Sequence, residues 1–221
     1  MRVLKFGGTS LANPERFSQA AKLIERAHLE EQAAGVLSAP AKITNHLVAL
    51  SEKAVLNQPT DSHFNEAIDI FYNIINGLHA ENNKFDLAGT KALVDAEFAQ
   101  IKNLLEEIRQ AGKVSDAVKA TIDCRGEKLS IAMMKAWFEA RGYSVHIVDP
   151  VKQLLAKGGY LESSVEIVES TKRVDAASIA KDKVVLMAGF TAGNENGELV
   201  LLGRNGSDYS AACLAACLGA S

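Results

Sequence analysis

Two glycine-rich turns contain the residue types that bind phosphate groups. The first is Lys5-Phe-Gly-Gly-Thr-Ser10 and the second is Gly203-Arg-Asn-Gly-Ser-Asp208, and each follows a short apolar run. Paired glycines allow backbone N–H groups to approach an anion, because no Cβ atom blocks the way. Lys5 adds a positive charge, although in a P-loop the lysine follows the glycines. The first turn alone fits a tight strand-to-helix connection equally well, but the two together favour a nucleotide-phosphate site.

A second group of polar residues has both a chemical and an ordinary structural interpretation. Glu127 could bind a cation, or it could be a solvated carboxylate in the first turn of a helix. Arg204 could bind a carboxylate or lie at the surface of its turn, and Asp208 could cap a helix. Ser38 and Thr44 could hydrogen-bond a ligand or cap helices near Pro40.

The composition excludes several classes of protein. With 221 residues, 48% of them hydrophobic and 23% charged, the chain should form one large or two small globular domains. A net charge of −3 argues against a general binder of nucleic acid or membrane surfaces. No apolar run reaches the about 20 residues that span a bilayer.

The cysteines and the first strand predict a cytoplasmic protein. Three cysteines in a chain of this length do not make a disulfide framework, which indicates a reducing compartment. The first strand begins within two residues of Met1, which leaves no room for a signal peptide. Cys213 and Cys217 share a helix face but lack further ligands, so we expect core residues and no metal site. The histidines are scattered, and we interpret His46 as a neighbour of the site at most.

Alternating apolar runs and helical periods predict a parallel α/β sheet. Asn13 before Pro14 is a favoured helix start. Strands are expected at 2–6, 33–37, 144–148 and 184–187, and helices at 13–31, 43–56 and 117–138, with two long helices between 60 and 113.

The C-terminal third is less regular. We expect a short strand at 165–168, a helix at 170–179, and a hairpin that turns at Asn194–Gly197. The last helix should run from Tyr209 to Leu218, with Ser207 or Asp208 as its cap. Because this small, apolar helix ends the chain, we expect more sheet to cover it in a longer protein, and self-association without that cover.

Four segments resemble, in the same order, the motifs of the aspartokinases in the amino-acid kinase superfamily. Two of them, with Met187-Ala-Gly-Phe-Thr-Ala-Gly193, are most similar to the threonine-sensitive branch of enteric bacteria that joins an aspartokinase to a homoserine dehydrogenase. The resemblance implies the three-layer α/β/α sandwich of the carbamate kinase-like type, with a mainly parallel sheet, truncated at its C-terminus. The segments are Lys5–Ser10, Leu37-Ser-Ala-Pro-Ala-Lys-Ile-Thr-Asn-His-Leu47, Arg125-Gly-Glu127 and Gly203-Arg-Asn-Gly-Ser-Asp-Tyr-Ser210.

The resemblance implies an activity and a role for each motif residue. The reaction would be transfer of a phosphoryl group from ATP, with Mg²⁺, to the β-carboxylate of L-aspartate, the first step toward threonine, lysine and methionine. Glu127 would contact the substrate ammonium and Arg204 a carboxylate. Asn205 replaces a glycine that is frequent in the family, but asparagine tolerates left-handed backbone angles. The implied catalytic residues are Lys5 and Asp208; the implied aspartate-binding residues are Ser38, Thr44, Glu127, Arg204 and Ser207; the implied phosphate-binding residues are Lys5, Gly7, Gly8, Ser10 and Gly206.

The resemblance also implies a domain organisation and leaves alternatives open. Residues 1–221 would form the N-terminal, amino-acid-binding part of the catalytic domain of a homo-oligomer. The adenine-binding half and the regulatory and dehydrogenase domains would lie beyond it, so we expect little activity from this part alone. One alternative is a sister kinase that acts on another carboxylate or a carbamate. The other is a non-catalytic module that binds an amino acid or forms a dimer.

Overall fold

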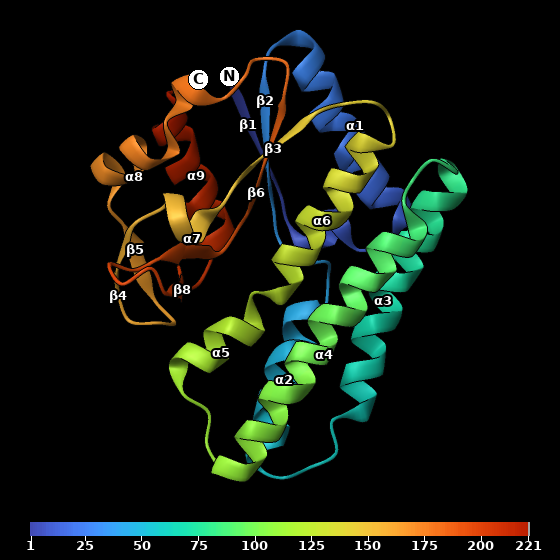
Figure 1. Cartoon of the computed structure of the whole chain (residues 1–221), viewed down its shortest axis with the longest axis vertical. Coiled ribbons are helices and arrows are strands. Elements are labelled where there is room, and N and C mark those ends of the chain that lie inside the picture. The colour runs from blue at the N-terminus through green and yellow to red at the C-terminus, as the bar shows by residue number, and fades with distance from the viewer. Residues whose placement is uncertain (221) are drawn as a thin grey trace.

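A parallel sheet forms the centre of the molecule. In the computed structural model, which describes residues 1–220, its strand order is β1-β2-β6-β3 (Figure 1). Every neighbouring pair is parallel. The apolar runs of β2 and β6 are buried along almost their whole length, as expected for inner strands covered on both faces. The four predicted strands are therefore confirmed as β1 (Arg2–Phe6), β2 (Ala33–Leu37), β3 (Val145–Val148) and β6 (Val184–Ala188).

Helices cover both faces of this sheet, which confirms the three-layer α/β/α architecture. On one face α1 (Pro14–Glu30) packs on β2, and α6 (Arg125–Glu139) packs on β2, β3 and β6. On the other face α9 (Gly206–Leu218) lies on β1 and β2, and α8 (Ile167–Val174) packs against α9 (Figure 1). None of the helices over residues 1–220 has the length and apolar character that crossing a membrane requires.

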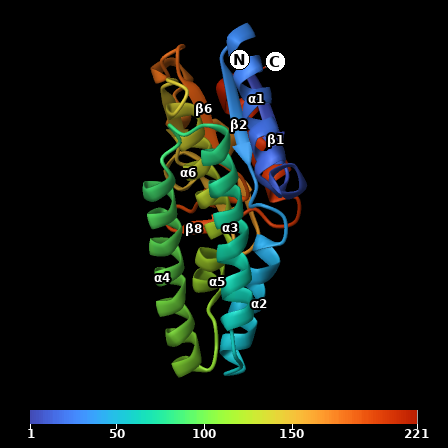
Figure 2. The same ribbon diagram turned by 90° about the vertical axis from the view of Figure 1, so that its right-hand side faces the viewer.

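Four further helices extend one side of the sandwich. They are α2 (Ile43–Val55), α3 (Asp61–Glu81), α4 (Leu87–Ala111) and α5 (Asp116–Asp123). Figure 2 shows α2, α3 and α4 side by side, and each packs against the other two. Their buried side chains, including Phe71 and Phe98, join the core under α1 and α6. The two long helices predicted between 60 and 113 are α3 and α4.

Short elements complete the chain. Two antiparallel pairs, β4 with β5 and β7 with β8, lie outside the main sheet. The predicted hairpin at 194–197 joins β7 to β8 and is confirmed. The remaining elements are η1 (Gly8–Leu11), α7 (Pro150–Gln153), β4 (Ala156–Gly158), β5 (Ser163–Val165), η2 (Ala176–Ser178), β7 (Thr191–Gly193) and β8 (Leu199–Leu201).

The strand predicted at 165–168 and the helix predicted at 170–179 are wrong in their bounds. The strand ends at Val165, and α8 begins at Ile167 and ends at Val174. Val168 is 75% exposed on the outer side of α8, so its β-branched side chain does not mark a buried strand. Asp175 takes a left-handed conformation (φ 42°), and this stops the helix before 179.

The start of α9 also differs from the prediction. The helix begins at Gly206 behind a left-handed Asn205 (φ 58°), so Ser207 and Asp208 lie in its first turn and do not cap it. The physical reason is that Asp208 forms an ion pair with Lys5 instead of bonding to its own backbone.

The apolar residues of α9 divide between a buried and an exposed side. Leu214 and Leu218 are buried, while Tyr209, Ala212 and Ala216 are exposed. The large aliphatic side chains of α9 are therefore covered within the described residues, and the self-association expected from this helix stays a prediction.

Candidate functional site

A cleft of about 630 Å³ opens at the carboxyl ends of β1 and β2. Strand ends of this kind are where open α/β sheets commonly bind ligands. The cleft brings together most of the residues predicted from sequence, although they come from four distant segments. Those that line it are Lys5, Gly8, Ser38, Thr44, Glu127, Arg204, Gly206, Ser207 and Asp208.

The other two predicted residues lie at its margin or outside it. Gly7 lies next to the Lys5 ammonium. Ser10 is exposed in η1, where its N–H donates to the Gly7 carbonyl (2.9 Å), and it lines a separate hollow of about 280 Å³ with Arg16. The structure therefore does not bring Ser10 to the cleft.

The loop after β2 lies directly against the first glycine turn. The Ala41 N–H donates to the Gly8 carbonyl (3.0 Å). A Cβ atom at Gly8 would lie only 2.9 Å from the Ala39 carbonyl oxygen, so this approach requires glycine. Ser38 is fixed at both backbone groups, because its N–H donates to Phe6 and its carbonyl accepts the Ser130 hydroxyl. The floor of the cleft is therefore held rigidly.

An ion pair connects the two glycine turns. Lys5 Nζ lies 2.8 Å from Asp208 Oδ1, although the two residues are at opposite ends of the sequence. The Asp208 side chain is 64% exposed and that of Lys5 is 26% exposed. Exposed ion pairs contribute little to stability. The pair therefore orients the lysine while leaving its charge available to a ligand.

Glu127 is a buried acid in the wall of this cleft. It is 4% exposed, and its Oε2 atom has no hydrogen-bond partner among residues 1–220. Burial raises the pKa of Glu127 to about 8, although backbone hydrogen bonds from Ala39 and Glu127 itself oppose this. A buried, unpaired carboxyl oxygen is costly until a donor reaches it. The solvated alternative for Glu127 is therefore wrong, and a ligand ammonium would be a fitting partner.

The three residues of the Arg125-Gly126-Glu127 motif make different contacts. Gly126 lets α6 approach the loop after β2, since a Cβ atom there would clash with Ala39 and Ile43. Arg125 points away from the cleft and pairs with Glu97 of α4. Lys128 binds the same carboxylate (2.5 Å). Burial opposes ionisation of Glu97, yet Lys128 and Arg125 hold its pKa below the ordinary value. This cluster anchors the start of α6, and with it Glu127.

Two helix N-termini give the rest of the cleft an affinity for anions. Within residues 1–220 no side chain caps α2 or α9, whose N-cap residues are Lys42 (φ 74°) and Asn205 (φ 58°). In these first turns the N–H groups of Ile43, Gly206 and Asp208 donate to preceding carbonyls, which leaves those of Thr44, Asn45 and Ser207 for a ligand. The helix dipole adds positive charge there. With Lys5 and Arg204 nearby, the cleft can bind one cation at Glu127 and several anionic groups elsewhere.

Sequence reasoning missed several residues that line the cleft. Lys42 and Asn45 lie within the second motif, but nothing in their types alone assigned them a role. Phe190 has a left-handed backbone (φ 71°), which the sequence does not signal for a phenylalanine. Asn205 lines the cleft as well and has the left-handed backbone that a glycine position requires (φ 58°).

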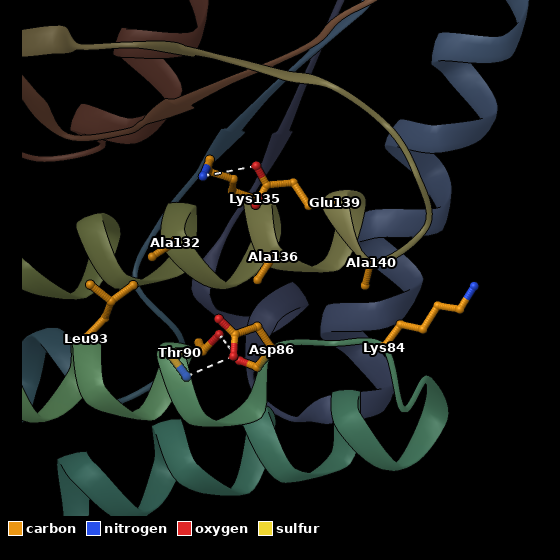
Figure 3. Close-up of a pocket in the computed structure, with 10 residues that line it drawn as sticks. Lys84, Asp86, Thr90, Leu93, Ala132, Lys135, Ala136, Glu139 and Ala140 are labelled. Atoms are coloured by element: carbon orange, nitrogen blue, oxygen red, sulfur yellow. Dashed lines mark hydrogen bonds and ion pairs between the residues drawn. The ribbon is translucent and has the colours of Figure 1, made fainter.

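A second hollow, of about 540 Å³, lies between α4 and α6 (Figure 3). Figure 3 shows Lys135 and Glu139 pointing toward each other, and their charged atoms are 3.0 Å apart. Asp86 accepts the Gly89 N–H and caps α4. These charged groups already have partners, and all the residues predicted for chemistry lie elsewhere. The cleft at the strand ends is therefore the better candidate site.

The sequence model of the amino acid kinase family matches residues 1–221. The chain is 93% identical over its whole length to the bifunctional aspartokinase/homoserine dehydrogenase of Haemophilus influenzae, and it spans 27% of that relative's length.

Two solved structures of aspartokinase III from E. coli have a similar fold. The complex with lysine and aspartate has a TM-score of 0.83, and the complex with aspartate and ADP has a TM-score of 0.81. Each is 25% identical to this chain and covers all of it, while the chain covers 48% and 47% of the two structures.

Proposed function

The chain belongs to the amino acid kinase family, and we propose that its cleft transfers the γ-phosphoryl group of ATP to the β-carboxylate of L-aspartate. The product would be 4-phospho-L-aspartate. The observation that carries this proposal is the buried, unpartnered carboxyl of Glu127 in one cleft with Lys5, Arg204 and two helix N-termini. The likeness to an aspartokinase that binds aspartate and ADP supports it.

The charges of the cleft match an α-amino acid with two carboxylates. The substrate ammonium would donate to Glu127, and the Arg204 guanidinium would bind the α-carboxylate in a bidentate manner. The hydroxyls of Ser38, Thr44 and Ser207 would hydrogen-bond the same substrate. This arrangement leaves the β-carboxylate to face Lys5 and the glycine turns.

The reaction requires positioning and charge stabilisation more than acid–base chemistry. A β-carboxylate oxygen attacks the γ-phosphorus and forms a new P–O bond. The bond from that phosphorus to the β,γ-bridging oxygen breaks, and its electron pair leaves with ADP. The attacking carboxylate is already ionised at neutral pH, so no general base is needed. Lys5, held by Asp208, and the N–H groups of Gly8 and Ser207 would stabilise the charge on the transferring group, whereas the Gly206 N–H donates to the Gly203 carbonyl (3.0 Å).

The donor set fits a Mg²⁺ ion that binds together with the nucleotide. Among residues 1–220 no group of three or more acidic, histidine or cysteine side chains could hold a metal ion. Mg²⁺ commonly uses one or two carboxylates plus substrate phosphates, and Asp208 is the exposed carboxylate of the cleft. When bound, the ion would neutralise charge on the phosphates.

The proposal extends to the setting of this part of the chain. Residues 1–221 would be the amino-acid-binding part of the catalytic domain, which is consistent with the 27% of the Haemophilus relative that they span. The free, buried cysteines support a reducing, cytoplasmic environment. The homo-oligomer implied by the aspartokinase motifs belongs to the same proposal.

A comparison of substrates tests this function. We expect the full-length protein to release ADP with L-aspartate, and to use succinate on the order of 10⁴-fold less efficiently, because succinate leaves Glu127 unpaired. The measurement is kcat/KM in a coupled ADP-release assay with aspartate, succinate, glutamate and carbamate. Equal use of succinate or carbamate would favour the sister-kinase alternative. Aspartate binding without ADP release would favour a non-catalytic module.

A further inference from the structure

Lys42 is a charged residue of the cleft that the proposed reaction does not yet use. It is the N-cap residue of α2 and lines the cleft beside Ser38, Thr44 and Glu127. Within residues 1–220 Lys42 forms no ion pair, whereas Lys5 pairs with Asp208. Its side chain is exposed and, among the described residues, has no acid within ion-pair distance, although Glu66 of α3 lies close enough for the charge of Lys42 to lower the pKa of that carboxyl.

The backbone of Lys42 is in a conformation that lysine disfavours. Its φ of 74° and ψ of −19° lie in the left-handed region, where glycine would be unstrained. Hydrogen bonds on both sides impose this conformation: Ala41 N–H donates to Gly8, and Ile43 N–H donates to Pro40. The side chain makes no capping hydrogen bond that would compensate. Strained non-glycine residues of this kind occur preferentially at functional sites.

The position of Lys42 indicates which part of a substrate it would meet. The preceding residue, Ala41, is hydrogen-bonded to Gly8 of the first glycine turn, which is the turn proposed to face the phosphates. Lys42 also opens α2, whose uncapped N-terminus adds positive charge at the same place. A phosphoryl group near Gly8 would therefore meet both.

We propose that Lys42 is a further substrate-binding residue of the cleft, whose ammonium group contacts the oxygens of the transferring phosphoryl group. This inference rests on the proposed phosphoryl transfer and adds a residue to it. With Lys42 included, Lys5 near the end of β1 and Lys42 in the loop after β2 share the charge of that group.

Three substitutions at one position separate charge from backbone strain. In the full-length protein we expect Lys42→Gly and Lys42→Ala to lower kcat/KM for ATP about 100-fold, with KM for aspartate unchanged. Lys42→Arg keeps the charge and should stay within about threefold of the parent protein. Lys42→Gly should also melt at a higher temperature than Lys42→Ala, because glycine relieves the left-handed strain.

A matched control and a reference reaction make the outcomes distinguishable. Asn57 has a similar left-handed backbone (φ 51°) outside the cleft, so Asn57→Gly should change activity by less than about twofold. Activity within threefold of the parent in both Lys42→Gly and Lys42→Ala would overturn the inference. A rise in KM for aspartate alone would also overturn it, because the contact would then be to a carboxylate. Absence of ADP release in the parent protein would instead reject the proposed function.

Discussion

Replacing Lys5 with alanine should lower kcat for aspartate phosphorylation about 10³-fold, with the fold intact. Lys5 lies beside Gly7 of the first glycine turn, where its ion pair with Asp208 holds it. Because Lys5 is proposed to stabilise the negative charge that redistributes over the phosphates as the transition state forms, the loss should appear in kcat more than in KM. The measurement is steady-state ADP release with both substrates varied.

Two controls accompany the Lys5 prediction. Lys135 forms an ion pair with Glu139 in the second hollow, so Lys135→Ala should leave kcat within about twofold. Thermal unfolding should show that Lys5→Ala is destabilised by less than about 1 kcal/mol, because the lost ion pair is largely exposed. A kcat for Lys5→Ala within threefold of the parent protein would remove Lys5 from its proposed role.

Aspartate binding should depend on pH through Glu127. In the unliganded protein burial raises the pKa of this carboxyl to about 8, but a substrate ammonium requires the ionised form. Above the pKa the carboxylate is ready to bind. Below it, a proton must leave first, so the dissociation constant for aspartate should rise about tenfold for each pH unit. Calorimetry from pH 6 to 9, in buffers of different ionisation enthalpy, measures both the affinity and the protons released.

Substitution of Glu127 tests the origin of that dependence. Glu127→Gln should weaken aspartate binding about 100-fold at pH 8.5, through loss of a charge-assisted hydrogen bond, and should abolish proton release. Glu139→Gln, which changes an acid in the second hollow, should leave both quantities unchanged. A flat pH profile in the parent protein, or proton release that persists in Glu127→Gln, would contradict the assigned role.

The sheet and most helices could be predicted because local sequence determines them. The apolar runs of β2 and β6 have no polar interruption, since both faces of these strands are covered. Asn13 followed by Pro14 marks the start of α1, and Asn13 Oδ1 accepts the Arg16 N–H as expected. In each case the residues that predict the strand or the helix start lie within that element or directly beside it.

Features that depend on distant contacts could not be predicted in this way. Lys42 takes a left-handed conformation at the start of α2, next to the hydrogen bond from the Ala41 N–H to the distant Gly8 carbonyl. Asp208 looked like a helix cap, because its partner Lys5 is about two hundred residues away in the sequence. The predicted start of α9 is wrong for the same reason.

The candidate site shows the same division. The motifs identified the residue types, but the burial of Glu127 follows from the close approach of Gly126 to Ala39, which no local pattern reveals. Conversely, Ser10 is adjacent to the glycines in sequence, yet the turn of η1 directs it to another hollow. A residue that is adjacent to site residues in the sequence therefore need not lie in the site.

Trapping the product tests the central claim most directly. The full-length protein, ATP with Mg²⁺ and L-aspartate are incubated with hydroxylamine, which converts an acyl phosphate to a hydroxamate. We predict aspartate β-hydroxamate in an amount equal to the ADP released, and its loss in Lys5→Ala. ADP release without hydroxamate, or equal hydroxamate from Lys5→Ala, would contradict phosphoryl transfer to the aspartate β-carboxylate in this cleft.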